Sequence, residues 1–352
     1  MKKGKKMKKI FVGLSGGVDS SVAAALLKRR GYDVTGVFIK VWSPEWLPCT
    51  WRADRRDAMR VAAALDIPFL TLDLSDEYKR GVVDKMVREY ARGNVPNPDI
   101  LCNKEVKFGA FLEFAFSRGA DGIATGHYAR ITDAAGGMSL EEARDANKDQ
   151  TYFLSAIKKE YLPHILFPVG EYEKRRVREL AHRFGLPTAR KKDSQGLCFL
   201  GHIEMKDFLR RFTDDAPGDV LDERGSVIGR HDGAFFYTLG QRHGFSVFRK
   251  AADAKPLYIV GKDMEKNTIT VSSRNPDMSG GKEIFLRDVN WISVPPEEGS
   301  VRIRYRGEKH PCRISLSDRG AVLSFDRPLL AQSGQSAAVY DGKRCVGGGV
   351  IA

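Results

Sequence analysis

The stretch FVGLSGGVDSSVAA at residues 11–24 decides the fold of the first half of the chain. An apolar run over residues 10–14 predicts a short strand, and a Gly-Gly turn follows it. Apolar residues at helical spacing then predict a helix over residues 20–30, which stops at Gly31. The next apolar run, residues 34–41, predicts a second strand, so the stretch opens a βαβ unit.

The Gly16-Gly17 turn lacks two common nucleotide-binding signatures, the lysine of GxxxxGK[ST] and the spacing GxGxxG. It offers backbone N–H groups at a helix N-terminus, with the hydroxyls of Ser20 and Ser21 added, which suits a pyrophosphate. Asp19 would repel phosphate unless it holds a cation, so its carboxylate indicates Mg²⁺ or an orienting role. A plain turn with a helix cap is the alternative.

The rest of the first half repeats this alternation of strands and helices. Helices are expected over residues 54–65, 78–90 and 105–118, strands over 69–74 and 122–125, and a proline-punctuated loop over 94–102. The pattern predicts an open, mostly parallel α/β sheet with helices on both faces, which binds ligands beyond the carboxyl ends of its strands.

The second half changes character. The basic stretch EKRRVRELAHRFG, from Glu173 to Gly185, predicts a small helical connector. Short β-like segments separated by glycine-rich turns follow and predict a closed or nearly closed β-barrel. These segments are residues 233–239, 257–260, 268–271, 301–305, 321–325 and 336–339.

Charge is concentrated in two places. The 352 residues carry a net charge of +13, and the lysine tail before Ile10 together with residues 174–192 accounts for all of it. Such basic segments suit a polyanion, although a solvated helix and a loose tail would look the same. No apolar run approaches the roughly 20 residues that span a bilayer, so no membrane contact is expected.

The five cysteines are odd in number and contain no CxxC pair, which argues against a disulfide framework and a zinc site and for a reducing cytoplasm. Cys102 is expected in the proline loop beside Lys104 and Lys107, and Cys198 follows three basic residues, so both thiol pKa values could be low. The remaining cysteines, Cys49, Cys312 and Cys345, are expected to be buried and inert.

The segment SGGVDS resembles the PP-loop signature of ATP pyrophosphatases, which split ATP to AMP and pyrophosphate while adenylating a substrate oxygen. Six further motifs in order along the chain resemble those of the tRNA-specific 2-thiouridylases. They are NPDILCNKEVKFGAFLEFA at residues 97–115, ATGHYAR at 124–130, NKDQTYFL at 147–154, FPVGE at 167–171, KKDSQGLCFLG at 191–201 and TLGQR at 238–242. The resemblance covers essentially the whole chain.

This resemblance implies an enzyme, an ATP-dependent tRNA-uridine 2-sulfurtransferase that acts on the wobble uridine of the tRNA anticodon stem-loop. It implies ATP with Mg²⁺, a Cys198 persulfide loaded by a sulfur-carrier protein or cysteine desulfurase, and Cys102 as the second thiol. Each turnover would end in a Cys102–Cys198 disulfide that a cellular thiol reduces. Direct attack by the persulfide and attack by released hydrosulfide both remain open.

The resemblance also assigns domains and site residues. We expect residues 1–168 to form the PP-loop catalytic domain, 169–213 a central connector with Cys198, and 214–352 a tRNA-binding barrel. Catalytic roles fall on Asp19, Cys102 and Cys198. Nucleotide contacts fall on Gly13, Leu14, Ser15, Gly16, Gly17, Val18, Asp19, Ser20, Ile39 and Gly126. Contacts with tRNA fall on Asn97, Pro98, Asp99, His127, Lys148, Asp149, Gln150, Arg304, Tyr305 and Gln335.

Several points stay open in the sequence. Alternation over residues 301–306 puts Arg302, Arg304 and Arg306 on one face, which suits either tRNA binding or ordinary strand packing. Residues 133–146 do not read like the β-hairpin common in the family. Alternative functions are another PP-loop enzyme, a tRNA-binding protein without catalysis, and a thiolase with an iron–sulfur cluster on the two cysteines.

Overall fold

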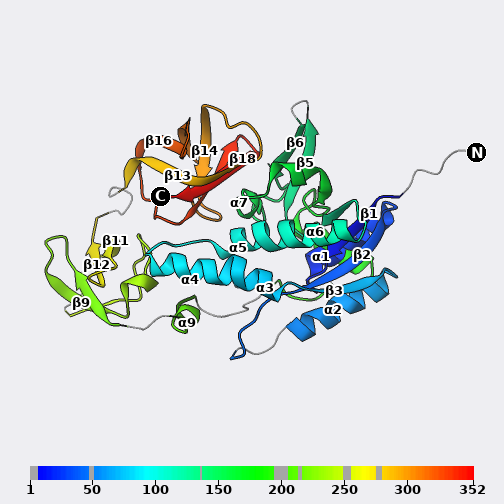
Figure 1. The fold of residues 1–352 in the computed structure, drawn as a ribbon, viewed down its shortest axis with the longest axis horizontal. Coiled ribbons are helices and arrows are strands. Elements are labelled where there is room, and N and C mark those ends of the chain that lie inside the picture. Colours follow the sequence, from blue (N-terminus) through cyan, green and yellow to red (C-terminus); the bar gives the residue numbers. More distant parts are fainter. Residues whose placement is uncertain are drawn as a thin grey trace, which may run out of the picture.

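The computed structural model describes residues 7–46, 51–134, 137–193, 205–212, 216–248, 255–274 and 280–352. Figure 1 shows three parts: a sheet layered with helices, a smaller sheet and a barrel. Across these ranges no helix combines the length and the apolar character needed to cross a bilayer.

The first part is built on five parallel strands in the spatial order β3-β2-β1-β4-β7. Side chains of the central strand alternate between two layers, with Ile10 and Val12 in one core and Phe11 in another. The predicted open parallel sheet is therefore confirmed. Its strands are β1 Lys9–Gly13, β2 Asp33–Lys40, β3 Phe69–Asp73, β4 Gly122–Ala124 and β7 Ile165–Leu166.

Helices cover both faces of this sheet. α1 and α2 bury Leu27 and Val61 against one face, and the helices from α3 to α6 bury Phe108 and Phe111 against the other. α8 packs outside α1 through Val177. The helical segments are α1 Val18–Arg29, α2 Trp51–Ala64, α3 Ser75–Tyr78, η1 Lys79–Val83, α4 Asp84–Ala91, α5 Pro98–Leu101, η2 Cys102–Ala110, α6 Phe111–Ser117, α7 Thr151–Leu154, η3 Lys159–His164, α8 Lys174–Arg183 and α9 Met205–Leu209.

The expected loop over residues 94–102 is partly wrong, because the helix begins at Pro98 rather than at residue 105. The Asn97 side-chain oxygen accepts hydrogen bonds from the backbone N–H groups of Asp99 and Ile100, at 3.0 and 3.2 Å. Proline at the first helical position needs no N–H partner there. Asn97 and Pro98 therefore start a helical run that continues from α5 through η2 to α6.

The single barrel expected in the second half is replaced by two β units with separate cores. The first is a five-stranded sheet of order β10-β9-β8-β12-β11, and the second is a six-stranded barrel, closed by pairing of β13 with β18. Residues 233–239, expected to be β, contain the 3-10 turn η4 Ala234–Phe236 instead. A closed C-terminal barrel is confirmed for the second unit.

The strands of the smaller sheet are β8 Gly218–Leu221, β9 Val227–His231, β10 Ser246–Val247, β11 Tyr258–Asp263 and β12 Thr268–Ser272. Those of the barrel are β13 Gly281–Trp291, β14 Glu298–Arg302, β15 His310–Ser317, β16 Gly320–Leu329, β17 Ser336–Asp341 and β18 Arg344–Ile351. The Tyr90 ring of α4 lies 5.7 Å from that of Phe235, which joins the smaller sheet to the first part.

A hairpin ties the barrel to the first part (Figure 1). Strands β5 Ala129–Ala134 and β6 Gly137–Glu142 pair with each other, and β6 also pairs with β18. Leu140 is fully buried at this junction. β5 and β6 thus form a hairpin although residues 133–146 do not read like the one common in the family, because pairing with a distant strand supports β structure that the local sequence signals weakly.

Candidate nucleotide and tRNA site

The glycine turn between β1 and α1 has the expected geometry. Gly16 adopts a left-handed conformation with φ of 75°, and a Cβ there would lie 2.4 Å from the Asp54 carbonyl oxygen. Gly17 occupies the N-cap position of α1, and no side chain caps this helix. The first N–H groups of α1 thus lack the side-chain acceptor that a plain helix cap would give, which leaves them available to a ligand oxygen.

Hydroxyl groups hold the turn in shape. Ser20 and Ser21 both donate to the Gly17 carbonyl, at 3.2 and 2.7 Å, and Ser20 accepts from the Ser15 backbone N–H at 3.2 Å. Thr188 donates to the Ser21 hydroxyl at 2.9 Å. Ser21 is therefore a structural residue of the turn, while Ser15 is exposed beside it.

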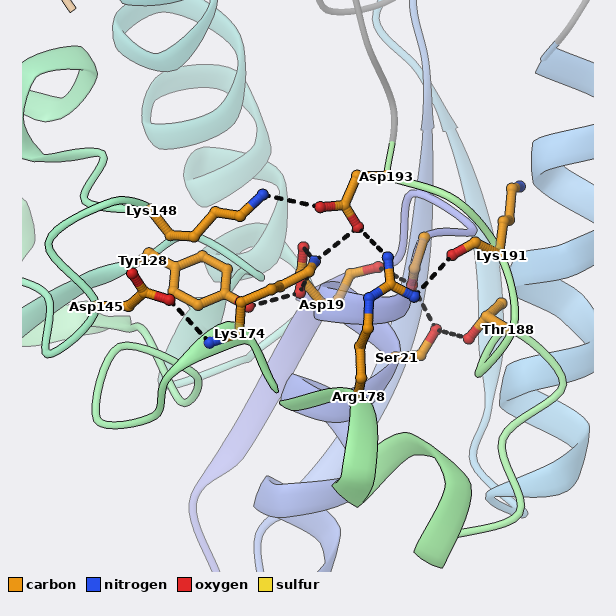
Figure 2. Close-up of polar contacts among 12 residues, drawn as sticks. Asp19, Ser21, Tyr128, Asp145, Lys148, Lys174, Arg178, Thr188, Lys191 and Asp193 are labelled. Atoms are coloured by element: carbon orange, nitrogen blue, oxygen red, sulfur yellow. Dashed lines mark hydrogen bonds and ion pairs between the residues drawn. The ribbon is translucent and has the colours of Figure 1, made fainter. Parts of the chain in front are cut away.

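Asp19 is the acidic residue of this turn, and two groups from distant segments bind it. Lys174 donates to both carboxylate oxygens at 2.7 Å, and the Tyr128 hydroxyl donates to one of them at 2.8 Å. Figure 2 shows the Lys174 side chain reaching Asp19 from the start of α8. Burial and the Asp19 charge raise the pKa of Tyr128, so its hydroxyl stays a donor.

Asp193 extends the cluster. Its carboxylate lies 2.9 Å from Lys148, 2.9 Å from Lys174 and 2.5 Å from Arg178 (Figure 2). Burial alone would raise the pKa of Asp193, but hydrogen bonds from Lys148 and Lys174 outweigh it and lower the value to about 2. The basic segment from Glu173 to Gly185 therefore does not present all of its charges to solvent. Lys174 and Arg178 make internal ion pairs, whereas Arg175 is exposed.

The residues expected to surround the nucleotide meet at the carboxyl ends of β1, β2 and β4. A Cβ on Gly126 would lie 2.5 Å from the Ser20 nitrogen, so the chain after β4 touches the start of α1. Gly13 ends β1 close to Thr125, and Ile39 lies near the end of β2, half-buried. The parallel sheet therefore places the glycine turn and the segment after β4 in contact with each other.

His127 is half-buried and packs against aromatic rings. Its ring lies 5.6 Å from Phe108 and 6.1 Å from Phe167, and its Nδ1 is 2.8 Å from the Thr125 hydroxyl. Burial, and secondarily the charge of Lys107, lowers the pKa of His127. Contact of His127 with tRNA stays a prediction.

A cleft of about 130 Å³ brings together four residues expected to bind tRNA. They are Asn97 from the start of α5 and Arg304, Tyr305 and Gln335 from the barrel. The other lining residues are Val95, Pro96, Tyr152, Ile303 and Ser336. The structure therefore places residues that are far apart in the sequence in one groove between the helical run and the barrel.

Other residues expected to contact tRNA lie elsewhere. Asp149 is buried, and it accepts hydrogen bonds from the Ala143 backbone, Thr151 and Arg302. Gln150 binds the backbone of Tyr128. Lys148 pairs with Asp193, and Asp99 lies in the first turn of α5.

The expected alternation of three exposed arginines over residues 301–306 is also wrong in one respect. β14 ends at Arg302, whose side chain is 19% exposed and pairs with Glu142 and Asp149. Arg304 and Arg306 remain exposed. Pairing with buried carboxylates draws Arg302 inward, so the basic face is smaller than expected.

The expected loop position of Cys102 is wrong, because Cys102 is the first residue of η2 and is completely buried. Lys104 is exposed on the same helical run. Cys198 and Cys49 lie outside the described residues. Burial raises the pKa of Cys312 to about 11 and that of Cys345 to about 12, which confirms them as buried, weakly acidic thiols.

Sequence reasoning missed Lys174 and Tyr128 as members of the site. Lys174 stood in the basic run, but no local spacing separates it from its exposed neighbours. Among the described residues no cluster of three or more His, Cys, Asp or Glu side chains could hold a metal ion. Asp19 alone fits Mg²⁺ that arrives on a nucleotide, since this ion commonly takes one or two carboxylates besides phosphate oxygens.

Three family models match the chain in order. They are described as the tRNA methyl transferase HUP domain at residues 8–202, the tRNA methyl transferase PRC-barrel domain at 206–273 and the aminomethyltransferase beta-barrel domain at 281–351. The strands of the smaller sheet lie within the second match, and those of the barrel lie within the third.

Curated relatives share the whole length. The tRNA-specific 2-thiouridylase MnmA of Bacillus subtilis (strain 168) is 43% identical, over 97% of this chain and 94% of that protein. The protein of the same name from Akkermansia muciniphila is 42% identical, over 97% and 98%. A solved U34-tRNA thiolase NcsA from Methanococcus maripaludis is only weakly similar, with 16% identity and a TM-score of 0.35 over 59% of this chain and 64% of that one.

The chain belongs to the tRNA-specific 2-thiouridylase family. The resemblance noted in the sequence is confirmed, and so is the prediction of an enzyme, a tRNA sulfurtransferase.

Proposed function

We propose that this protein replaces the C2 oxygen of the wobble uridine in tRNA with sulfur, in a reaction driven by ATP. The observation that carries the proposal is the uncapped N-terminus of α1 behind a Gly-Gly turn, with Asp19 beside it. This arrangement suits a polyphosphate chain, and the family relationship supplies the substrate.

The first chemical step is adenylation. The uracil C2 oxygen attacks the α-phosphorus of ATP, the bond to the bridging oxygen breaks, and pyrophosphate leaves. N–H groups of the Gly16-Gly17 turn and the start of α1 stabilise the charge on the leaving group. Mg²⁺ carried by ATP, with Asp19 as one ligand, would neutralise further phosphate charge. The adenylated oxygen is then a good leaving group, which departs as AMP when sulfur forms a bond to C2.

The second step supplies sulfur. A persulfide on Cys198 provides the sulfur atom, and Cys102 forms a disulfide with Cys198, so the two thiolates give the two electrons that the sulfane sulfur takes up. A cellular thiol then reduces the disulfide, and a sulfur-carrier protein or cysteine desulfurase reloads Cys198. This chemistry needs reduced cysteines, which supports a cytoplasmic location.

The cleft between α5 and the barrel suits the anticodon region of the tRNA. Arg304 is exposed at this cleft and can bind a phosphate, and Tyr305 offers an aromatic face. Phe153 lies 4.4 Å from the Tyr305 ring, which holds that face in place. Asn97, Pro98 and Asp99 at the start of the helical run lead directly to Cys102, so a base extruded near them would approach the thiol.

The test is mass spectrometry of nucleosides from unmodified tRNA incubated with ATP, Mg²⁺ and a sulfur donor. Wild type and Cys312→Ser should produce 2-thiouridine, whereas Cys102→Ser and Cys198→Ser should produce none. Cys312 is the matched control because its thiol is buried in the barrel core, away from the turn. Thiolation by the Cys198 variant would refute the persulfide route. If wild type still splits ATP to AMP but produces no 2-thiouridine, the proposal that tRNA uridine is the substrate would be refuted.

Methyl transfer is the second candidate, because two of the matching family models carry that description. The same experiment separates the candidates, since sulfur replaces an oxygen while a methyl group adds carbon and hydrogen, and the two products differ in mass. Methyl transfer would also proceed without ATP hydrolysis to AMP and pyrophosphate.

A further inference from the structure

Helix α7 touches both the cleft and the helical run that carries Cys102. On the cleft side, the Tyr152 hydroxyl donates to the Ser336 carbonyl oxygen at 3.0 Å, and the Phe153 ring lies 4.4 Å from the Tyr305 ring. Tyr152, Tyr305 and Ser336 all line the cleft. A hydrogen bond and a ring contact therefore fix α7 to the barrel wall of the cleft.

The other side of α7 is held by Asn103, the residue that follows the Cys102 thiol. Asn103 is 2% exposed, and its Nδ2 donates to the Phe153 carbonyl oxygen at 3.0 Å. The last carbonyl groups of a helix lack intrahelical donors, so Asn103 supplies a donor to Phe153 that α7 itself does not. One amide thus connects the run at the thiol to the helix that lines the cleft.

Packing alone does not explain an amide at position 103. The Oδ1 atom of Asn103 is buried and accepts no hydrogen bond from the residues that the structure describes. An unpaired buried acceptor destabilises a fold, and leucine, which has the same branched shape, would fill the place without that cost. The group that leucine lacks is the N–H donor to Phe153, so this bond is what the amide contributes.

Cys102 lies between two asparagine anchors. Asn97, five residues before it, caps the helical run and lines the cleft, and Asn103 follows it directly. The thiol between them is completely buried. Fixing a helical segment at two points sets the place of the residues between, and a displacement of about 1 Å at reacting atoms can lower a rate about 100-fold.

We propose that Asn103 is a positioning residue for the Cys102 thiol, and that its bond to α7 sets the distance of the thiol from the cleft proposed for tRNA. The Asn103 side chain acts through α7 and touches neither the nucleotide nor the tRNA. The inference rests on the proposed function for the roles of Cys102 and of the cleft.

Single-turnover reactions with ATP, unmodified tRNA and a sulfur donor separate the two chemical steps. Pyrophosphate release reports adenylation, and 2-thiouridine reports sulfur transfer. Asn103→Leu should leave tRNA affinity and pyrophosphate release within about 2-fold of wild type and slow 2-thiouridine formation about 10- to 100-fold, because only the thiol is displaced. Asn103→Ala carries the same prediction if leucine prevents folding. Asn103→Gln keeps an amide donor and should recover part of the rate.

Asn290→Leu is the matched control. The Asn290 amide of β13 donates to the Ser155 and Ile157 carbonyl oxygens just after α7, at 3.0 and 2.8 Å. This variant loses bonds of the same kind near the same helix, but none to the run with Cys102. It should lower the melting temperature and keep the wild-type ratio of the two steps. If Asn103→Leu slows both steps and weakens tRNA binding together, or slows neither step, the positioning role is wrong.

A measurement without substrates separates this inference from the proposed function. Iodoacetamide is added to the full chain, and peptide mass spectrometry gives the alkylation rate of each cysteine. In Asn103→Leu, Cys102 should react several-fold faster than in wild type, whereas Cys312, buried in the barrel core, should keep its rate.

Equal alkylation rates of Cys102 in Asn103→Leu and Asn290→Leu would overturn the inference even if wild type thiolates tRNA. Failure of the proposed function alone would appear as missing 2-thiouridine in wild type, with the difference in alkylation intact.

Discussion

At the scale of single residues, the site depends on positions where any side chain would collide with backbone. Gly126 is the clearest case, because its φ is not in the left-handed region and the constraint is space alone. The Cβ of a larger residue would lie 2.7 Å from the Asp19 carbonyl carbon as well as 2.5 Å from the Ser20 nitrogen. The segment after β4 can therefore touch the start of α1 only as glycine.

We expect Gly126→Ala to push these two segments apart, at a cost of about 1–3 kcal/mol in unfolding free energy. ATP affinity should fall with it, because the start of α1 is the proposed phosphate site. Urea denaturation and ATP titration check the two effects. Gly261→Ala is the control, since its Cβ would lie 3.6 Å from Thr270, an ordinary contact; equal behaviour of both variants would contradict the prediction.

The acidic limb of the stability curve should report on Asp193. Its pKa is lowered from 3.8 to about 2, so the ionised carboxylate stabilises the fold above pH 4. That contribution should disappear as the pH falls through the range from about 4 to 2. Denaturation of wild type and Asp193→Asn across this range checks it: the wild-type advantage should shrink on acidification, and an advantage independent of pH would refute the assignment.

At the scale of elements, the helical run from Pro98 to Ser117 links the start of the cleft to Cys102, the proposed catalytic thiol. Asn97 caps this run and also lines the cleft, so one side chain serves the fold and faces the proposed tRNA site. Cys102 lies one turn further on, buried in the same core as Phe108. The cap and the thiol therefore belong to one continuous helical run.

Two substitutions separate these roles of Asn97. Asn97→Ala removes the cap and should cost about 1 kcal/mol of stability, whereas Asn97→Asp keeps the cap and should leave stability nearly unchanged. If Asn97 also contacts tRNA, the aspartate should still weaken tRNA binding, because it loses a donor and adds negative charge. Melting temperature and tRNA affinity measure the two effects; full tRNA affinity in Asn97→Asp would confine the residue to capping.

At the scale of the whole molecule, an interior ion-pair network joins the barrel to the catalytic part. Arg302 of β14 lies 3.2 Å from Glu142 and 3.1 Å from Asp149, and Lys309 lies 2.8 Å from Glu142. Thr151 is 3.1 Å from the Tyr340 hydroxyl across the same boundary. The cleft has walls from both parts, so its width depends on this junction.

Arg302→Met should destabilise the protein by about 3 kcal/mol, because it leaves the buried Asp149 carboxylate without its cation. Tryptophan fluorescence during urea denaturation provides the measurement. The control is Arg313→Met, in the same barrel but in an exposed pair with Glu298, which should cost under about 1 kcal/mol. A similar loss in both variants would mean that the interior network adds nothing beyond a surface pair.

The sequence by itself determined the parallel sheet, the glycine turn and the family, because each depends on residues close together in the chain. Apolar periodicity, glycines at a strand end and ordered motifs are local signals. The expected secondary structure was wrong at the start of the helix at Pro98, where a cap overruled local preference, and at residues 233–239, which contain a 3-10 turn. The hairpin of β5 and β6 depends on pairing with a distant strand, which the local sequence signals weakly.

Only the tertiary structure decided which side chains meet. Lys174 reaches Asp19 because Val177 and its neighbours pack α8 on α1, and Arg304 joins Asn97 in one cleft because the barrel docks beside α5. The packing of whole apolar faces sets these contacts. The neighbours of each polar residue in the sequence therefore do not indicate which side chains it will meet. The reaction class is therefore encoded locally, whereas the contact of Lys174 with Asp19 and the walls of the cleft exist only once the parts have assembled.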